Sequence, residues 1–133
     1  MLCERSLYRY AHGSTLSNHQ TVQNWIADSE AEMQAARLMT LHAAEKVDAQ
    51  DPEVRTIISA IKVFVPAAYH RVVDRAIQVF GAAGIANDFP LAGMYLSARS
   101  LRLADGPDEV HKILIAKSVM RRRDAGEGWD FGS

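Results

Sequence analysis

Two long segments with a helical period meet at Asp51 and Pro52, and they constrain this chain more than any other feature. From about residue 20 to 48, candidate core positions recur at steps of three, four and seven residues: Val22, Ile26, Met33, Ala36, Thr40, Ala43 and Val47. From about 52 to 80 the period continues through Val54, Ile57, Ile61, Phe64, Ala68, Val72, Ala76 and Val79. Asp is a favourable N-cap and Pro suits the first helical position. We therefore expect two long antiparallel helices, with a kink in the second at Pro66.

Shorter helical segments flank this pair. Residues 1–10 have the pattern of the last turns of a helix, and a Gly-Ser-Thr break follows them. A helix is expected from about 91 to 103 and a last one from about 107 to 122. The core-facing stripe expected on the last helix is Val110, Ile113, Leu114, Lys117 (through its stem) and Met120. We predict an all-α, up-and-down helical bundle over residues 1–123 with a truncated first helix, followed by a flexible tail, 124–133.

The composition excludes several classes of protein. A chain of 133 residues with 48% hydrophobic and 23% charged residues suits one globular domain. A formal net charge of -1 gives no general affinity for nucleic acid, and no apolar run approaches the roughly 20 residues of a membrane span. Residues 1–20 lack the apolar centre of a secretory signal, and a single cysteine, Cys3, suits a reducing compartment. The expected location is therefore cytoplasmic.

Two loops carry the candidate chemistry, and each has a purely structural alternative. Gly81–Gly84 follows a helix, so it is either a helix C-cap or a place where bare backbone approaches a flat ligand. Asp105 lies between two small residues, just before the helix-start signals at residues 107–109. Its carboxylate is either a cap of the last helix or a general base that points into a cleft. The five histidines form no HxxxH pair and no cluster with Cys3, so no metal site is expected.

Four motifs occur in one order along the chain. They are Arg9-x-x-x-Gly13-x-x-Leu16-x-x-His19-Gln20, residues 76–84 (AIQVFGAAG), Ser97-Ala98-Arg99 and residues 103–110 (LADGPDEV). Together they resemble the C-terminal helical domain of the acyl-CoA dehydrogenases, FAD-dependent enzymes that desaturate acyl-CoA thioesters. The resemblance covers about residues 1–122 and is greatest to the branch that includes family members 10 and 11. In that family the domain is a four-helix bundle that follows an N-terminal helical domain and a β-domain, neither of which occurs in this sequence.

The resemblance implies an FAD site to which two segments contribute. Arg9 matches an arginine that reaches the FAD of a neighbouring subunit, and His19 and Gln20 match a His-Gln pair near the same cofactor. The loop that holds the adenine half across the dimer interface is matched by Gln78, Val79, Phe80, Gly81 and Ala82. These segments depart from the family pattern in two places. Tyr10 and Ala11 stand where the family usually has Lys or Val and then Thr, so a hydroxyl is lost, and Ala82 replaces a glycine.

The resemblance also implies a role for Asp105, which matches the position of the catalytic base. In the family this carboxylate removes a proton from Cα of the thioester while a hydride passes from Cβ to the flavin. The medium- and short-chain branches usually have Glu there, and Asp shortens the reach by about 1.5 Å. Pro107 and Glu109 stand where the family usually has Thr and Gln in contact with the flavin, and proline has no hydroxyl.

The resemblance therefore implies a domain that supplies the base position, part of an FAD site and the interface of a homo-oligomer. An acyl-CoA would be the substrate of the complete enzyme, and the isolated domain is expected to be inactive. The alternative is a non-catalytic helical assembly module derived from the same family, and a helical protein of unrelated function is a third hypothesis. Retention of yellow FAD by the purified chain would favour the first hypothesis, and colourless protein the second.

Overall fold

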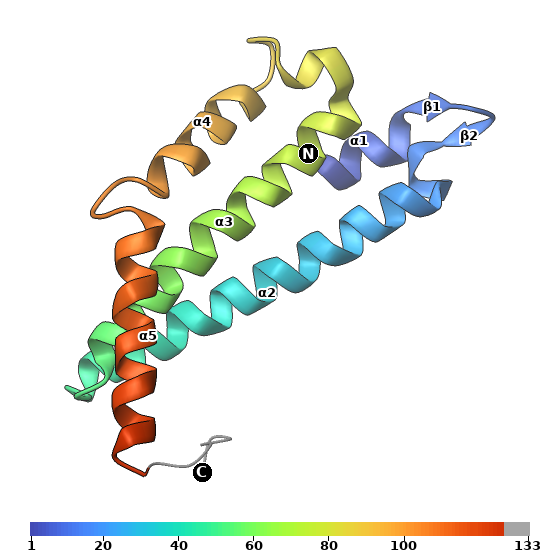
Figure 1. The fold of residues 1–133 in the computed structure, drawn as a ribbon. Helices are drawn as coiled ribbons and strands as arrows, with labels where there is room; N and C mark the ends of the chain where they lie inside the picture. Colours follow the sequence, from blue (N-terminus) through green and yellow to red (C-terminus); the bar gives the residue numbers. More distant parts are fainter. Residues whose placement is uncertain (127–133) are drawn as a thin grey trace.

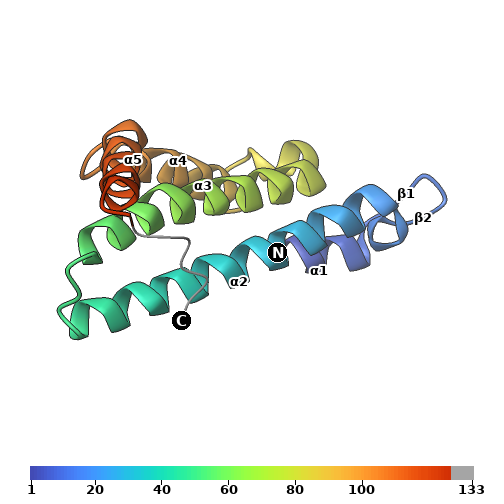
Figure 2. The same cartoon turned by 60° about the horizontal axis from the view of Figure 1, so that its bottom comes forward.

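A pair of long antiparallel helices forms the spine of the molecule in a computed structural model, which describes residues 1–126. The pair comprises α2 (Gln20–Asp48) and α3 (Val54–Phe80) (Figure 1). Helix α3 is central, because α1 (Leu2–Tyr8), α2, α4 (Leu91–Leu101) and α5 (Asp108–Asp124) all pack against it. Figure 2 shows α4 and α5 on one side of α3, and α2 with α1 on the other. The all-α prediction is confirmed. Of the predicted tail, residues 127–133 lie outside the described residues.

The boundary between the long helices differs slightly from the prediction. The predicted N-cap role of Asp51 is wrong, because the N-cap of α3 is Glu53 and no side-chain hydrogen bond caps the helix. Helix α3 begins at Val54, two residues later than Pro52, because residues 52 and 53 form a turn in which Asp51 Oδ1 accepts a hydrogen bond from the Glu53 amide at 2.8 Å. The helix then stays α-helical through the buried Pro66 and ends at Phe80. Gly81 follows with a φ of 65°, the positive φ expected of a glycine that ends a helix.

A small hairpin joins α1 to α2, and the sequence interpretation missed it. Strand β1 (Tyr10–Ala11) pairs with β2 (Ser14–Thr15) in antiparallel fashion, and a 3-10 turn, η1 (Leu16–Asn18), leads into α2. The two residues of the tip, His12 and Gly13, both have positive φ, 51° and 87°. This conformation matches the right-handed twist of the flanking strands.

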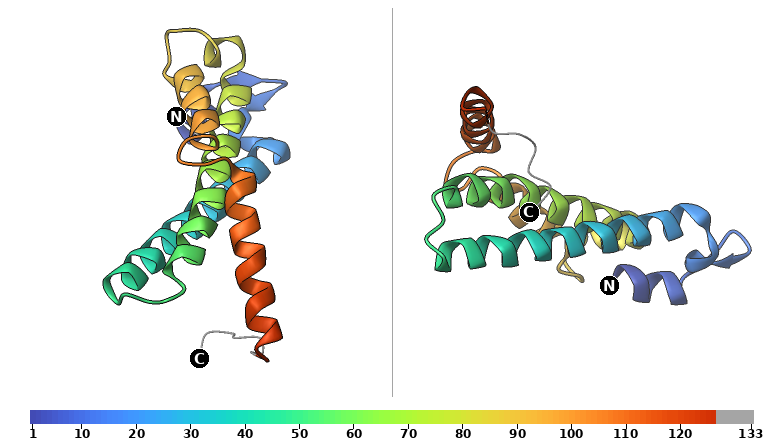
Figure 3. Two further views of the ribbon diagram at one scale, coloured as in Figure 1. Left: turned by 60° about the vertical axis from the view of Figure 1, so that its left-hand side comes forward. Right: turned by 90° about the horizontal axis from the view of Figure 1, so that it is seen from below.

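The predicted core stripe of the last helix is wrong. Val110, Ile113 and Met120 are 55%, 56% and 63% exposed, Lys117 is exposed, and Leu114 is half-buried. Helix α5 instead turns a polar face to α3, with Asp108 and Ser118 buried. Ser118 Oγ donates a hydrogen bond to Glu53 Oε2 at 2.7 Å. Figure 3 shows the last turns of α5 extending beyond the other helices. The apolar stripe of α5 is largely uncovered by other described residues.

The core is built largely from small side chains. Its buried apolar members are Val22, Ala43, Ala68, Val73, Ala76, Val79, Leu91 and Ala98. Alanines at these positions let the helices approach closely. One segment, Val54–Gly84, is long and apolar enough to cross a membrane by length and composition alone. A helix that packs against four others in a bundle meets the same criteria, so the expectation of no membrane span stays a prediction.

Candidate functional site

The hairpin positions the first set of predicted cofactor residues. His19 Nε2 lies 3.0 Å from the Ala11 carbonyl oxygen and 3.1 Å from Ser14 Oγ, so this ring holds both strands. A ligand contact by His19 would therefore come from its other ring nitrogen. The Arg9 carbonyl accepts from the Leu16 amide at 2.8 Å, while the Arg9 side chain is exposed. Gln20, the first residue of α2, is also exposed.

The second set lies at the end of α3, and its members face different surroundings. Val79 is buried in the core, so its side chain cannot reach a ligand. The Phe80 ring lies 4.8 Å from the Phe89 ring, and the Arg5 guanidinium lies 5.4 Å from the centre of the Phe80 ring. Gln78, Gly81 and Ala82 are exposed. A Cβ on Gly81 would meet nothing within 4 Å, so bare backbone faces open space here.

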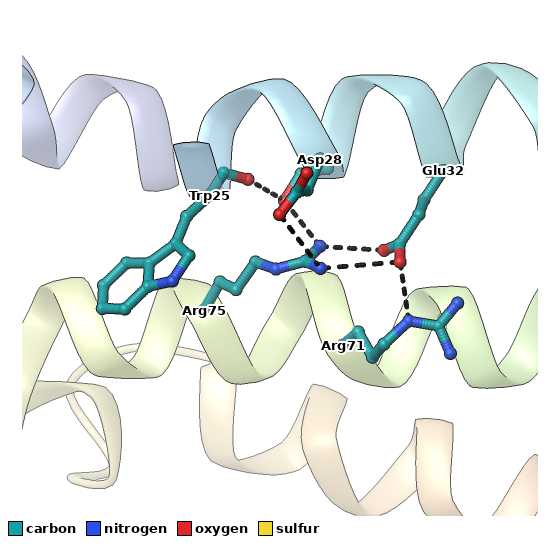
Figure 4. A network of polar contacts seen from close by, with 6 residues as sticks. Trp25, Asp28, Glu32, Arg71 and Arg75 are labelled. Carbon is teal, nitrogen blue, oxygen red and sulfur yellow. Dashed lines mark hydrogen bonds and ion pairs between the residues drawn. The ribbon is translucent and has the colours of Figure 1, made fainter. Parts of the chain in front are cut away.

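A network of charged side chains joins α2 to α3 (Figure 4). Arg75 Nη1 donates to Glu32 Oε2 at 2.8 Å and to Ser29 Oγ at 3.2 Å, and Arg71 Nε donates to Glu32 Oε1 at 2.7 Å. Asp28 lies 3.9 Å from Arg75. Burial raises the pKa of Glu32, but the hydrogen bonds from the two arginines outweigh it and the pKa is lowered.

A pocket of about 590 Å³ opens beside this network. Its lining is polar and aromatic, from Trp25, His70, Arg71, Asp74, Arg75, Gln78 and Tyr95. The His70 ring packs 4.2 Å from the Tyr95 ring, and His70 Nε2 is buried without a hydrogen-bond partner among residues 1–126. No group of three or more His, Cys, Asp or Glu side chains within the described residues could hold a metal ion.

The loop that carries Asp105 is fixed at both of its ends. Lys62 Nζ donates to the Leu101 carbonyl oxygen at 2.6 Å, which ties the end of α4 to α3. Arg102 Nε donates to Asp108 Oδ2 at 2.8 Å, and the Asp108 amide donates to the Arg102 carbonyl oxygen at 3.2 Å. These contacts hold the chain on both sides of Asp105.

Asp105 itself is exposed and has an unusual backbone. Its φ is 54°, and Gly106 follows with a φ of 102°. Positive φ is uncommon outside glycine, although aspartate tolerates it better than most residues. The N-cap position of α5 is Pro107, and no side-chain hydrogen bond caps it. Asp105 therefore does not cap α5. Pro107 and Glu109, which follow Asp105 in the sequence, are also exposed.

The two parts of the predicted site are far apart within one chain. The Asp105 loop lies beside Ser59 and Lys62 in the first half of α3, whereas Gln78 is near its end. Nineteen residues of helix separate Ser59 from Gln78, which corresponds to about 28 Å. One chain therefore does not assemble Asp105 and the Gln78–Ala82 segment into one cluster.

The structure adds residues that the sequence interpretation did not single out. His111 and the buried Ser59 contact each other at 3.1 Å and approach the Asp105 loop, and Arg102 and Asp108 close the loop. A serine within the apolar stretch 57–61 of α3 was the available signal, because a buried hydroxyl requires a partner. The Ser59 partner lies 52 residues away, which a spacing pattern cannot reveal.

Comparison with known proteins places the chain in a family. Residues 2–120 match the family model described as "Acyl-CoA dehydrogenase, C-terminal domain". Acyl-CoA dehydrogenase family member 11 of Rattus norvegicus is 48% identical over 122 residues, which are 91% of this chain and 16% of that protein. The chain thus spans about a sixth of the length of this relative.

Solved structures agree with this assignment. A protein assigned as an acyl-CoA dehydrogenase from Mycobacterium abscessus superposes with a TM-score of 0.89 at 41% identity, covering 92% of this chain and 30% of that one. The FAD complex of PigA gives a TM-score of 0.84 at 26% identity, covering 91% and 31%. The chain belongs to the acyl-CoA dehydrogenase family, as a C-terminal helical domain similar to that of family member 11.

Proposed function

We propose that this chain serves as the C-terminal domain of a flavin-dependent acyl-CoA dehydrogenase and that Asp105 is its general base. The observation that carries the proposal is the state of Asp105: exposed, next to a glycine, held at positive φ and without a capping role. The carboxylate would take the proton from Cα of an acyl-CoA thioester, and the Cα–H electron pair would become part of the new double bond. FAD, when bound, supplies the acceptor for the hydride that leaves Cβ.

The residues at the hairpin end fit an FAD-binding role. An exposed guanidinium at Arg9 suits a pyrophosphate, and an exposed amide at Gln78 can bond an adenine or a phosphate oxygen. The bare backbone at Gly81 leaves space for a flat ring. The separation of about 28 Å along α3 supports a composite arrangement. One copy would contribute Asp105 to its own active site and the Gln78–Ala82 segment to the FAD of a neighbouring copy.

A composite site requires a homo-oligomer, and the surface supports one. An apolar groove of about 530 Å³ runs between the start of α1, α2 and α3. The side chains that line it include Ile26, Met33, Val65, Tyr69, Leu91 and Met94. Exposed contiguous apolar surface of this kind usually marks an interface. The expected oligomer is at least a dimer, in the cytoplasm.

The same surface favours the alternative function, a non-catalytic assembly module. The chain spans 16% of the rat relative, and a domain alone retains only part of the contacts that an FAD or an acyl-CoA needs. The module would bind other copies or longer subunits through the groove and the exposed face of α5, without bound FAD.

The experiment places residues 1–123 into the rat relative in exchange for the matched segment and measures substrate-dependent bleaching of the flavin band at about 450 nm. If Asp105 is the base, Asp105→Asn reduces the rate by about 10²–10⁴-fold and leaves FAD bound. Asp88→Asn, at an exposed carboxylate beyond the other end of α4, is the matched control and retains the rate. Retention of most of the rate by Asp105→Asn would contradict the proposed base.

A further inference from the structure

The side chain that contacts the Asp105 main chain is His111, on the first turns of α5. Its Nε2 lies 3.3 Å from the Asp105 carbonyl oxygen, and its Nδ1 lies 3.1 Å from Ser59 Oγ on α3. A carbonyl oxygen only accepts, so the proton of the neutral ring must sit on Nε2. Nδ1 then accepts, and the Ser59 hydroxyl donates to it. His111 is thus a bridge from the buried Ser59 to the loop.

Gly106 completes the fit between the ring and the loop. A Cβ on Gly106 would lie 3.3 Å from His111 Nε2 and 3.9 Å from its Cδ2. The imidazole therefore packs over bare backbone, and any side chain at 106 would press on it. The glycine is also required for its φ of 102°. Hydrogen bond and packing together hold the ring against two successive residues of the loop.

The other anchors of the loop act at its ends rather than at Asp105. Lys62 holds Leu101, and Arg102 pairs with Asp108. The strained residue lies between these anchors, and positive φ persists in a non-glycine residue only when its surroundings hold it. A rotation at Asp105 would swing the carboxylate while both anchors stayed in place. The contact between His111 Nε2 and the Asp105 carbonyl oxygen restrains this backbone rotation.

We propose that His111, oriented by Ser59, is a positioning residue that sets the direction of the Asp105 carboxylate. The catalytic consequence rests on the proposed role of Asp105 as the base. The geometric part is independent of that role, because it requires only that the Nε2–H tautomer of His111 holds the loop. The two parts can therefore fail separately.

The geometric part is tested on the full chain by NMR at about pH 8, above the ordinary pKa of an imidazole. Long-range ¹H–¹⁵N spectra of the wild-type imidazole identify the tautomer, and the Nε2–H form is expected. Hydrogen exchange is then measured at the Asp108 amide, whose bond to Arg102 closes the loop. His111→Leu should accelerate this exchange by about tenfold, the factor that one hydrogen bond of ordinary strength represents. His111→Gln, which keeps an N–H donor near the Nε2 position, should stay within about threefold of wild type, less than that factor.

Ser118→Ala is the matched control. Ser118 is another buried serine of the α3–α5 contact, but its hydroxyl bonds Glu53 and is distant from the loop. An Nδ1–H tautomer in the wild type, or an acceleration in His111→Leu no greater than in Ser118→Ala, would overturn the proposal. The tautomer measurement tests the proposal even if a variant fails to fold, because it uses the wild-type chain.

The catalytic part is tested in the rat chimaera described above. His111→Leu should lower kcat by at least about tenfold, with KM and bound FAD unchanged, and His111→Gln should restore most of it. If the NMR results hold but kcat does not change, the loop is held by His111 and the catalytic consequence is wrong. If Asp105→Asn is also fully active, the proposed base is wrong and the geometric result still stands.

Discussion

Replacement of Glu32 by glutamine tests the lock between α2 and α3. Glu32 accepts charge-assisted hydrogen bonds from Arg75 at 2.8 Å and Arg71 at 2.7 Å, with side chains 20%, 16% and 47% exposed, respectively. A buried bond of this kind contributes about 1.5–3 kcal/mol, and exposure reduces the value. Glutamine keeps one acceptor oxygen but no charge. We therefore expect a loss of about 2 kcal/mol, or a fall in Tm of roughly 6–10 °C for a domain of this size.

The pH dependence of the same variant supplies a sharper check. The pKa of Glu32 is lowered in the folded chain, because the hydrogen bonds from the arginines outweigh burial. The unfolded chain therefore binds this proton more readily, and the stabilisation is present above the unfolded pKa and lost as the pH falls through the folded value. The difference in the free energy of unfolding between wild type and Glu32→Gln should have its greatest value at pH 7 and decrease as the pH falls below about 4.

Thermal unfolding by circular dichroism measures both effects, with Glu45→Gln as the control. Glu45 is an exposed glutamate on the same helix, and this change should shift Tm by little. If the loss in Glu32→Gln equals that in Glu45→Gln, or does not shrink in acid, the charged network does not stabilise the α2–α3 contact and the reasoning is refuted.

Three further predictions concern assembly, cofactor and backbone. Light scattering of the purified chain should give a mass above 14.7 kDa, because the groove beside α1 is apolar; a stable monomer at micromolar concentration would contradict this. The chain alone should bind FAD weakly, because contacts from one part of the site leave little after an association cost of about 4–15 kcal/mol; a submicromolar Kd from titration would contradict this. Gly106→Ala should lower Tm, because φ is positive and the new Cβ meets His111, whereas Gly93→Ala, within α4 with open space around it, should raise stability by about 0.5–1 kcal/mol. Equal changes in Tm for the two variants would show that neither the positive φ of Gly106 nor its contact with His111 determines the effect of the substitution.

The second long helix was predictable because its stripe packs within one chain: every predicted stripe position of α3 is buried or half-buried. The stripe of α2 is confirmed only in part, because three of its seven predicted positions, Met33, Thr40 and Val47, are exposed. The period failed on α5, where the apolar stripe is exposed and the polar face packs on α3. Periodicity identifies the apolar face of a helix, but it does not identify the surface that covers it. Within the described residues, no surface of the same chain covers the apolar stripe of α5.

The candidate site was predictable where neighbouring residues form a motif and not where distant residues meet. The position of Asp105 followed from the sequence, but its positive φ did not, because aspartate adopts this conformation rarely. The bridge from Ser59 through His111 to the loop joins two helices, and local sequence carries no record of it. The hairpin was missed for a related reason: two-residue strands are too short to show alternation, and the tip, His12 and Gly13, lacks the Asn-Gly or Asp-Gly pair typical of tight hairpins.

The alanine-rich core has a consequence for how this domain tolerates mutation. Ala98 is fully buried and Ala43 is 3% exposed, so a larger side chain at either position would press on the neighbouring helices. In most cores, truncation of large residues causes the greatest damage, because it leaves cavities. Here the corresponding damage comes from enlargement, since an added methyl group must push two helices apart at a cost of about 1–3 kcal/mol. Sequence drift in this domain is therefore limited by side-chain volume at a few alanines, while the large apolar residues on its surface are free to change until a partner covers them.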